Sequence, residues 1–319
     1  MTILVFGWYN NGNVGDDLFA DAFRKLFPSC DFKFTSQMTE ANLAGVDVVI
    51  LGGGSFIDKD IVATPKAIAQ LKTKKIMYIG VGAETDISPM HTELMKLARL
   101  IAIRSPNFLN KIKALNENTI VIPDIVYALQ EDVVQSKKID KSVLILPNLE
   151  VVPNHGSAHW KYSSYEYFKS EFAQFVDELV SSGHQVKFFS MCQNGTMSDS
   201  WAAAQIITMM GKRSTKYQLD YMTGDIAALT KEMSQYSVIL TQRYHGIVLA
   251  EMMQTPYISI HHHDKLKFAA PMRGSSESFY GIMKANLLNS FNSLNTSKSL
   301  PIETDIFDSL KQVVADIIS

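Results

Sequence analysis

The sequence predicts an α/β fold made of two doubly wound, Rossmann-like domains that face a cleft. Short apolar runs alternate with amphipathic stretches almost from end to end of the 319 residues. This alternation is typical of parallel sheets with helices on both faces. A polar stretch near the middle interrupts the pattern, which then restarts. The chain is also longer than the ~150 residues typical of one domain.

The first half contains six apolar runs separated by helical patterns. The predicted strands are Ile3–Gly7, Phe32–Thr35, Asp47–Gly52, Ile76–Gly82, Leu100–Arg104 and Thr119–Pro123. The predicted helices are Asp16–Phe27, Ala63–Lys72, Pro89–Arg99 and Pro106–Leu115. Two of these helices follow a serine, Ser88 and Ser105, which can cap the helix while the next residue, proline, suits its first position.

The polar stretch Gln130–Lys141 marks the predicted boundary between an N-terminal domain, residues 1–135, and a C-terminal domain, residues 136–300. In the second domain we predict strands at Val143–Leu146, Val186–Ser190, Val238–Thr241 and Tyr257–Ile260. The predicted helices are Ser164–Ser182, with a capping box from Ser163 to Glu166, then Asp199–Gly211, Asp225–Gln235 and Gly246–Gln254. Asn286–Ser299 predicts a loop, and Glu303–Ile318 predicts a closing helix within residues 301–319.

Composition excludes several classes of protein. Apolar residues make up 46% of the chain and charged residues 19%, which argues against disorder. The 30 basic and 32 acidic side chains give a net charge of −2, so nothing favours nucleic-acid binding. Two cysteines, Cys30 and Cys192, suit a reducing compartment. No apolar run approaches the ~20 residues that span a bilayer, so we expect a soluble, cytoplasmic protein.

Two glycine-rich segments follow predicted strands, where ligands of open α/β sheets bind. The first runs from Gly7 to Asp17 with the spacing G-x4-G-x2-G, which is neither the dinucleotide fingerprint nor a P-loop. It could present helix N–H groups to an anion or a sugar, or be a long turn in which Asp16 caps a helix. The second is Gly52-Gly53-Gly54, where a bare backbone favours close approach of a ligand over a simple tight turn.

Arg104 ends a predicted strand and could pair with a carboxylate or phosphate. A solvated arginine beside a helix start is the alternative. Asp124, which follows the next predicted strand, could likewise belong to a site or be a solvated side chain.

The segment Thr241–Gly246 leads from a predicted strand straight into a helix and carries Arg243 and His245. A cation, a titratable imidazole and helix N–H groups at one point suit a compact dianion. A structural histidine in the core is the alternative for His245. The run His261–His263 could suggest a metal site, but adjacent side chains alternate in direction. Lys265 is favoured as another anion contact.

In these residues the chain resembles the polysaccharide pyruvyl transferase family. The family outline appears here as Gly7-Trp8 to Asp16-Asp17, then Asp47 to Gly54, then Arg104, then Arg243-Tyr244-His245-Gly246 and finally Lys265. The resemblance implies a GT-B-like fold and transfer of the enolpyruvyl group of phosphoenolpyruvate to a sugar as a ketal, with release of phosphate. Tyr244 stands where leucine is usual, and the His-rich segment before Lys265 stands where tyrosine is common.

The resemblance also implies the site residues. In the family the Arg-x-His block holds phosphoenolpyruvate, which implies catalytic roles for Arg243 and His245. The imidazole of His245 is in addition the best chemical candidate for proton transfer. The substrate-binding residues are Asn13, Gly15, Asp16, Gly52, Gly53, Gly54, Arg104, Tyr244, Gly246 and Lys265. The acceptor lies on the N-terminal side and phosphoenolpyruvate on the C-terminal side. No metal or redox cofactor is required. The expected partners are phosphoenolpyruvate and a saccharide acceptor, whose lipid carrier could bring peripheral contact with a membrane.

Two other functions stay open on the same architecture. A nucleotide-sugar glycosyltransferase would use a glutamate on the ribose, for which Glu251 is the nearby candidate, and a non-catalytic glycan-binding relative would keep the fold alone. A dehydrogenase is disfavoured because no dinucleotide fingerprint is present. The aromatic residues Trp8, Tyr9 and Trp160 could stack on sugar rings or belong to the core or rim.

Overall fold

The computed structural model describes residues 2–83, 86–148, 158–193, 198–211, 225–261, 266, 274–294 and 304–318, with side chains from residue 164 onward in the segment 158–193. The chain forms two compact units. The first contains residues 1–11, 16–131 and 302–319, and the second contains residues 12–15 and 132–301. A four-residue piece near the N-terminus therefore belongs to the second unit.

The first unit contains a six-stranded parallel sheet in the order β2-β1-β3-β4-β5-β6. Its strands are β1 (Thr2–Phe6), β2 (Asp31–Thr35), β3 (Val48–Ser55), β4 (Lys75–Gly82), β5 (Leu100–Ile103) and β6 (Thr119–Val121). Its helices are α1 (Val14–Leu26), α2 (Glu40–Leu43), α3 (Pro65–Leu71), α4 (Pro89–Leu97), α5 (Leu109–Lys113) and α12 (Ile306–Ile318), with 3-10 turns at Pro106–Phe108 and Ile125–Asp132.

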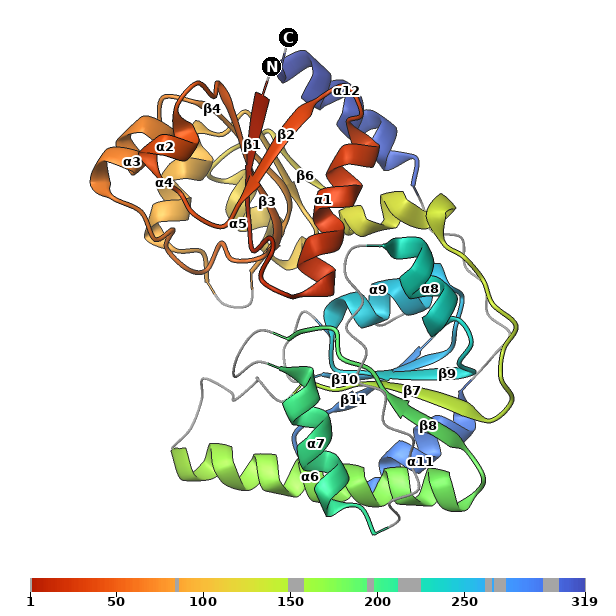
Figure 1. Ribbon diagram of the computed structural model, residues 1–319. Helices are drawn as coiled ribbons and strands as arrows, with labels where there is room; N and C mark the ends of the chain where they lie inside the picture. Colours follow the sequence, from red (N-terminus) through yellow and green to blue (C-terminus); the bar gives the residue numbers. More distant parts are fainter. Residues whose placement is uncertain are drawn as a thin grey trace. The chain divides into compact units, whose positions relative to one another are not determined.

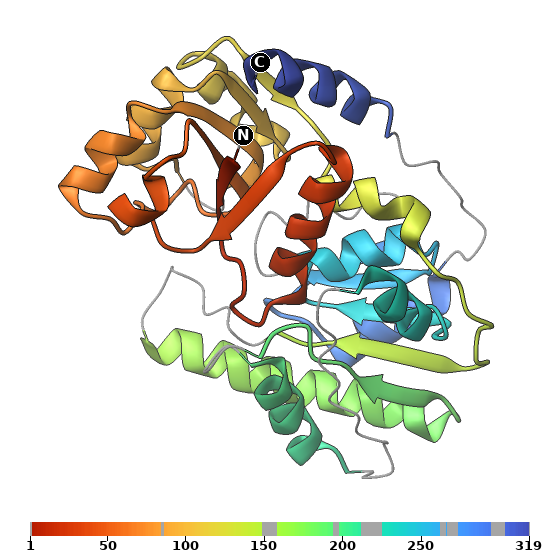
Figure 2. The ribbon, with the colours of Figure 1, turned by 45° about the horizontal axis from the view of Figure 1, so that its top comes forward.

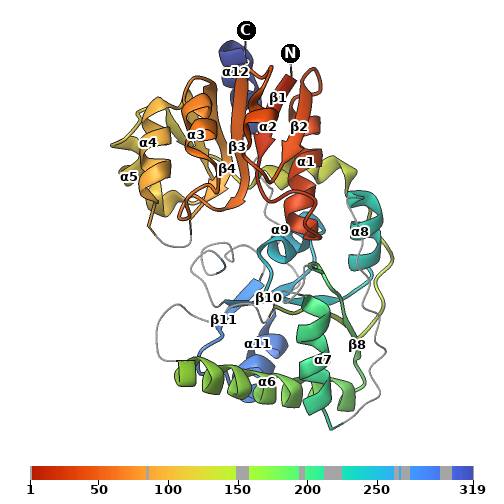
Figure 3. The same cartoon turned by 60° about the vertical axis from the view of Figure 1, so that its left-hand side comes forward.

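Helices cover both faces of this sheet. Helices α2 to α5 cover one face, where Leu43, Leu71 and Leu94 join a core with the strand residues Val49 and Tyr78. Helices α1 and α12 lie on the other face (Figures 1 and 3). Strand residues alternate between the two faces, so strands buried on both sides read as the continuous apolar runs seen in the sequence.

The second unit contains a five-stranded parallel sheet in the order β11-β10-β9-β7-β8. Its strands are β7 (Ser142–Leu146), β8 (Gln185–Phe188), β9 (Val238–Thr241), β10 (Tyr257–His261) and β11 (Gly274–Ser278). Its helices are α6 (Ala158–Ser181), α7 (Asp199–Met209), α8 (Ile226–Met233), α9 (Tyr244–Met252) and α11 (Lys284–Ser293). Figure 3 shows α8 and α9 on one face and α6, α7 and α11 on the other.

Both sheets have the same strand order. Numbered within its own unit, each runs 2-1-3-4-5, and the first adds a sixth strand at its edge. In this order the chain reverses direction across the sheet between strands 1 and 3, which are β1 and β3 in one unit and β7 and β9 in the other. Ligands of such folds bind at the carboxyl ends of those two strands. The predicted fold class, two doubly wound parallel sheets, is confirmed.

The structure corrects the sequence analysis at four places. The predicted loop Asn286–Ser299 holds α11, because Leu287 is fully buried and Phe291 packs on the same core despite the Asn-rich and Ser-rich composition. Strand β11 was missed because its sequence, GSSES, has no apolar residue. Helix α6 begins at Ala158, so Ser163 does not cap it. Ser105 makes no side-chain cap bond, whereas Ser88 accepts from the His91 N–H at 3.2 Å.

The polar stretch after the first unit is attached to the second unit. Val134 N–H donates to Thr230 Oγ1 at 3.0 Å, and Gln135 Nε2 donates to the Met253 carbonyl at 2.9 Å.

Over the residues that the structure describes, every helix is too short or too polar to cross a membrane.

A buried histidine, His91, leads us to expect that the first unit loses stability in acid. His91 in α4 is fully buried, and its Nδ1 lies 2.9 Å from the Tyr78 hydroxyl oxygen. Burial lowers the pKa of His91 to about 4, and the carboxylates of Asp60 and Asp58 oppose this shift only in part. In the unfolded chain histidine titrates near pH ~6.5. The unfolded state therefore binds the proton first as the pH falls, and this favours unfolding below about pH 6.5.

We expect His91→Gln to remove much of this acid sensitivity. Because the pKa of His91 is lower in the folded state, the wild type should lose roughly 2 kcal/mol of unfolding free energy when the pH falls from about 7 to about 5. Urea titrations of the wild type and the variant at both pH values measure the difference. His184→Gln in the second unit is the matched control and should lose as much stability in acid as the wild type. Equal acid sensitivity of His91→Gln and wild type would contradict the prediction.

Candidate functional site

The end of β9 is tightly folded around Thr241. Its Oγ1 accepts the Arg243 N–H at 2.9 Å and donates to the Arg243 carbonyl at 3.0 Å. Helix α9 begins at the next residue, Tyr244, with Arg243 at its N-terminal cap position. Gly246 is needed here, because a Cβ at that position would lie 2.2 Å from Thr241 Oγ1. This geometry places Arg243 at the amino end of a helix, where N–H groups favour anions.

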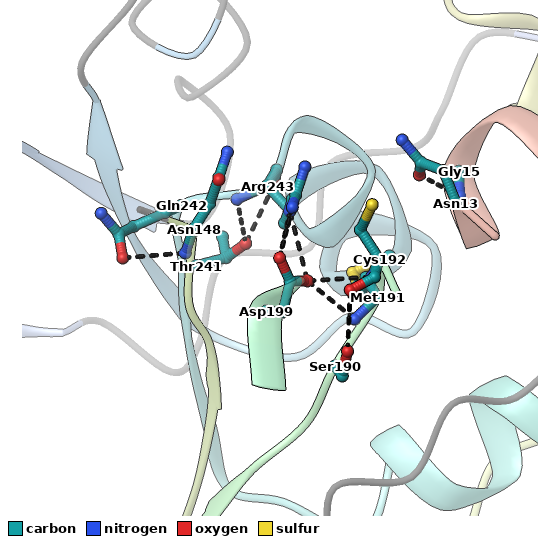
Figure 4. Close-up of polar contacts among 10 residues, drawn as sticks. All are labelled: Asn13, Gly15, Asn148, Ser190, Met191, Cys192, Asp199, Thr241, Gln242 and Arg243. Carbon is teal, nitrogen blue, oxygen red and sulfur yellow. Dashed lines mark hydrogen bonds and ion pairs between the residues drawn. The ribbon is translucent and has the colours of Figure 1, made fainter. Parts of the chain in front are cut away.

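Arg243 forms an ion pair with Asp199, the first residue of α7 (Figure 4). Arg243 Nε donates to the two carboxylate oxygens at 3.0 and 3.2 Å, and Nη2 donates to Oδ1. The Asp199 side chain is 0% exposed and that of Arg243 is 11% exposed. A two-point contact with a planar guanidinium fixes its orientation.

The Asp199 carboxylate also organises the segment after β8. Its Oδ2 accepts the backbone N–H groups of Met191 and Cys192 at 2.9 and 3.0 Å (Figure 4). In turn the Asp199 N–H donates to the Cys192 carbonyl at 2.9 Å. Burial raises the pKa of Asp199, while the charge of Arg243 and these N–H bonds favour the carboxylate.

The segment Gly12–Gly15 joins this arrangement as part of the second unit. Val14 N–H donates to the Met191 carbonyl at 2.9 Å, and Gln193 N–H donates to the Gly12 carbonyl at 2.9 Å. Asn13 forms an antiparallel bridge with Cys192. The Asn13 side-chain oxygen accepts the Gly15 N–H at 3.1 Å, so Asn13 rather than Asp16 caps the start of α1.

His245 lies directly against Gly15. A Cβ on Gly15 would stand 1.9 Å from His245 Nδ1, so only glycine fits beside the imidazole. His245 is 9% exposed and meets the Tyr244 ring edge-on, with ring centroids 5.3 Å apart. The imidazole therefore has a defined place in the first turn of α9, within the same unit as Arg243.

The ends of β7 and β9 are connected beside these residues. Gln242 N–H donates to the Leu146 carbonyl at 3.0 Å, and Gln242 Oε1 accepts the Asn148 N–H at 3.1 Å (Figure 4). These are the two strands between which the second sheet changes direction. Arg243 and His245 thus come directly after the carboxyl end of β9, where folds of this class bind their ligands.

The other predicted arginine belongs to the first unit. Arg104 Nη1 donates to Asp124 Oδ2 at 2.5 Å, and Nη2 donates to Ser55 Oγ at 3.0 Å. Both partners of the ion pair are nearly inaccessible, with side chains 5% and 0% exposed. Asp124 Oδ1 also accepts the Val126 N–H at 3.0 Å. Arg104 therefore has a structural role between β3, β5 and the chain after β6, and its contact with a substrate stays a prediction.

The three consecutive glycines end β3 in the first unit. A Cβ on Gly52 or Gly53 would lie 2.7 Å from the ring of Phe23 or Phe19, so the close packing of α1 on β3 accounts for two of them. Gly53 and Gly54 also have positive φ, at 79° and 87°. The Asp16 carboxylate lies 3.4 Å from the position a Gly54 Cβ would take. A substrate role for Asp16 and these glycines stays a prediction.

Of the three aromatic residues proposed as sugar contacts or as part of the core or rim, Tyr9 and Trp8 differ in exposure. Tyr9 is not exposed: it is buried, and its hydroxyl donates to the Gly52 carbonyl at 2.7 Å. Trp8 is 50% exposed. The Trp160 side chain lies outside the described residues.

Lys265, His262 and His263 also lie outside the described residues. His261 Nδ1 is 2.9 Å from Ser276 Oγ. In the part of the chain that the structure describes, no three His, Cys, Asp or Glu side chains gather as a metal site would need.

Among the residues that the structure describes, six of the predicted site residues fall in the second unit, and the sequence analysis missed Asp199, which contacts Arg243 and the backbone beside Asn13. Asn13, Gly15, Arg243, Tyr244, His245 and Gly246 lie there together. Asp16, the three glycines and Arg104 lie in the first unit. Asp199 was predicted only as the start of a helix. Its position after β8, at the sheet edge that also carries Arg243, was the available signal.

Comparison with known proteins identifies the family. The family model for polysaccharide pyruvyl transferases matches residues 13–264, most of the chain, including the Asn13–Gly15 segment, Asp199 and Arg243. The chain belongs to the polysaccharide pyruvyl transferase family, which is a family of transferases. No curated protein matches the sequence.

Solved structures share the fold at low sequence identity. UDP-GlcNAc 2-epimerase from Methanocaldococcus jannaschii, in complex with UDP-GlcNAc and UDP, has a TM-score of 0.61 and 10% identity over 99% of this chain and 99% of that chain. UDP-GlcNAc 2-epimerase from Neisseria meningitidis, bound to UDP-GlcNAc, has a TM-score of 0.58 and 11% identity over 100% and 99% of the two chains. The GT-B-like assignment of the fold is confirmed.

Substitution of Gly15 tests the contact with His245. We expect Gly15→Ala to lower the unfolding free energy by about 1–3 kcal/mol, because its methyl group overlaps the imidazole. Denaturant titration measures the change. Gly211→Ala is the matched control, because its Cβ would meet only Asp177 Oδ2, at an ordinary 3.4 Å. Equal stability of the two variants would disprove the close contact.

Proposed function

We propose that the protein transfers the enolpyruvyl group of phosphoenolpyruvate to a sugar of a glycan or glycan precursor, forming a cyclic ketal and releasing phosphate. The observation that carries the proposal is the placement of Arg243, oriented by Asp199, beside His245 at the amino end of α9. These residues lie in the segment that matches the family.

The charges of the site suit this donor. Phosphoenolpyruvate has a carboxylate and a phosphate, about three negative charges in total near neutral pH. The amino end of α9 supplies N–H groups and a partial positive charge, and Arg243 adds the charge of a guanidinium, a group that pairs with carboxylates and phosphates. Arg104 and Lys265 are included in the proposal as further contacts with the donor, in line with the family pattern.

The chemistry needs one proton donor and two acceptor hydroxyls. A proton added to the methylene carbon of phosphoenolpyruvate leaves an oxocarbenium-like centre at C2. One sugar hydroxyl attacks C2 and loses its proton. A second hydroxyl then attacks C2, loses its proton and closes the ketal, while phosphate leaves with the C2–O bonding electrons and takes up a proton. His245 is the candidate for proton transfer, a role typically worth roughly 10²–10⁴-fold in rate. No step of this sequence needs a metal or a redox cofactor.

The remaining roles follow from the same proposal. The second unit binds the donor and the first unit contributes the acceptor side, where the half-exposed Trp8 could stack on a sugar ring. The acceptor is a saccharide, free or carrier-linked, and we place the reaction in the cytoplasm.

A nucleotide-sugar glycosyltransferase is the second candidate. It would need a carboxylate to hold the ribose, and Glu251 was the candidate. Glu251 is buried in α9, and its Oε1 accepts the Tyr257 hydroxyl at 2.7 Å. This contact within the core counts against a ribose role. The similarity to nucleotide-sugar epimerases concerns the fold alone, at 10–11% identity.

Titration calorimetry with phosphoenolpyruvate and a panel of nucleotide sugars tests the donor. We expect wild type to bind phosphoenolpyruvate and Arg243→Ala to lose this binding, because the substitution removes the guanidinium charge at the amino end of α9. Arg24→Ala is the control, since Arg24 pairs with Asp21 on the surface of the first unit. Binding of a nucleotide sugar without phosphoenolpyruvate would favour the glycosyltransferase, and binding of neither would favour a non-catalytic relative.

The pH dependence of the rate tests His245. Turnover with phosphoenolpyruvate should show a limb in the range where histidine titrates. We expect His245→Gln to lose that limb and to be slower by roughly 10²-fold or more. A wild-type profile retained by the variant would assign the proton transfer to another group.

A further inference from the structure

We propose that Asp199 is the positioning residue of this site and that its single carboxylate sets both Arg243 and His245. The proposal rests on the proposed function for its ligand, phosphoenolpyruvate, but its geometry is independent of that ligand. Three steps of direct contact lead from Asp199 to the two side chains, all within the second unit.

The first step fixes the guanidinium. An arginine side chain has four rotatable bonds, so it needs a partner to hold one orientation. Asp199 takes the Nε–Nη2 edge of Arg243 with both carboxylate oxygens. This contact fixes the plane of the fork and therefore the direction in which Nη1 donates. Asp199 is itself held at the start of α7, with its side chain fully buried.

The second step fixes the backbone after β8. The same carboxylate accepts the N–H groups of Met191 and Cys192, and the Asp199 N–H donates to the Cys192 carbonyl. Three hydrogen bonds to one residue therefore determine the path of Met191 and Cys192. Ser190 Oγ, which donates to the Cys192 carbonyl at 3.0 Å, adds a fourth local contact.

The third step reaches the imidazole. The Met191 carbonyl accepts the Val14 N–H at 2.9 Å, and Cys192 pairs with Asn13. These bonds hold the start of α1, in which the bare Cα of Gly15 lies against His245. Displacement of Met191 and Cys192 would move Gly15 and release the imidazole. Asp199 thus acts on His245 through the backbone and on Arg243 directly.

The donors around Asp199 explain why a carboxylate is needed. The neighbours of this side chain are all donors: the Arg243 nitrogens and two backbone N–H groups. Both side-chain oxygens of Asp199 must therefore be acceptors. An amide has one acceptor oxygen and one NH2 group, so in Asp199→Asn at least one donor would face another donor. If Asp199 only reduced the charge of Arg243, the neutral amide would strengthen anion binding instead. The two roles therefore predict opposite changes in affinity.

A double-mutant cycle with phosphoenolpyruvate measures the positioning role. We expect Asp199→Asn to weaken binding about tenfold or more in wild type and by less than about threefold in an Arg243→Lys background, because lysine cannot form the two-point contact. Asp199→Glu keeps the charge but moves the carboxylate by one methylene, and we expect it to weaken binding too. Unchanged or tighter binding by Asp199→Asn, or equal effects in both backgrounds, would overturn the proposal.

Two controls separate positioning from stability. Glu232→Gln removes the charge of another ion pair in the second unit, that with Lys187 at 2.7 Å, and should leave phosphoenolpyruvate affinity unchanged. Thermal unfolding of each variant reports whether it is folded. If Asp199→Asn does not fold, Asp199→Glu decides the question, and wild-type affinity of that variant would overturn the proposal.

Histidine-selective NMR tests the geometry without any ligand. The His245 ring signal, identified by its loss in His245→Gln, should shift or broaden in Asp199→Asn, whereas the signal of His91 in the first unit should not. This readout distinguishes the two proposals if wild type fails to bind phosphoenolpyruvate. A shift of the His245 signal would then support positioning while the donor assignment fails. A His245 signal that stays in place would overturn the positioning role.

Discussion

The buried carboxylate of Asp199 is the interaction on which the arrangement of the second unit depends. A charge with no exposure to water is tolerated only when partners satisfy it, and Asp199 has a guanidinium and two backbone N–H groups. These partners come from two parts of the chain, the segment after β8 and the start of α9. The buried charge of Asp199 therefore connects the start of α7 with the segment after β8 and with the start of α9.

The parallel strand order explains why these parts meet. In each sheet the first and third strands of the unit are neighbours: β1 and β3 in one, β7 and β9 in the other. The segments that follow these two strands start side by side at the carboxyl end of the sheet and then run in different directions. In the second unit that end carries Gln242 and Arg243 after β9 and Asn148 after β7. In the first unit it carries the glycines at the end of β3, whose small size lets α1 approach the strand. The same topology thus gives a polar edge in one unit and close helix packing in the other.

The sequence predicted what depends on local pattern. Strand β9 has the predicted bounds, Val238–Thr241, because four apolar or β-branched residues precede a polar turn. The helix at Lys284–Ser293 was missed because it is held by the packing of Leu287, Leu288 and Phe291 on the core, which its polar composition does not indicate. At the site, Arg243 and His245 belong to one short motif, whereas Asp199 lies 44 residues away and no periodicity connects the two. The position of Asp199 after β8 indicates the sheet edge that it shares with Arg243, but the contact between the two side chains is known only from the structure.

The division of the chain has a consequence for how the protein folds during synthesis. The first unit includes α12, which lies beside its other elements in Figures 1 and 2 and whose Ile317 carbonyl accepts a bond from Lys75 Nζ at 2.8 Å. Residues 12–15 are synthesised long before their partners near residue 192. The ribosome therefore releases the last piece of the first unit only after the whole second unit has emerged. The two units are not modules that can be cut apart at residue 131, because each fragment would lack a piece that the other half of the chain carries.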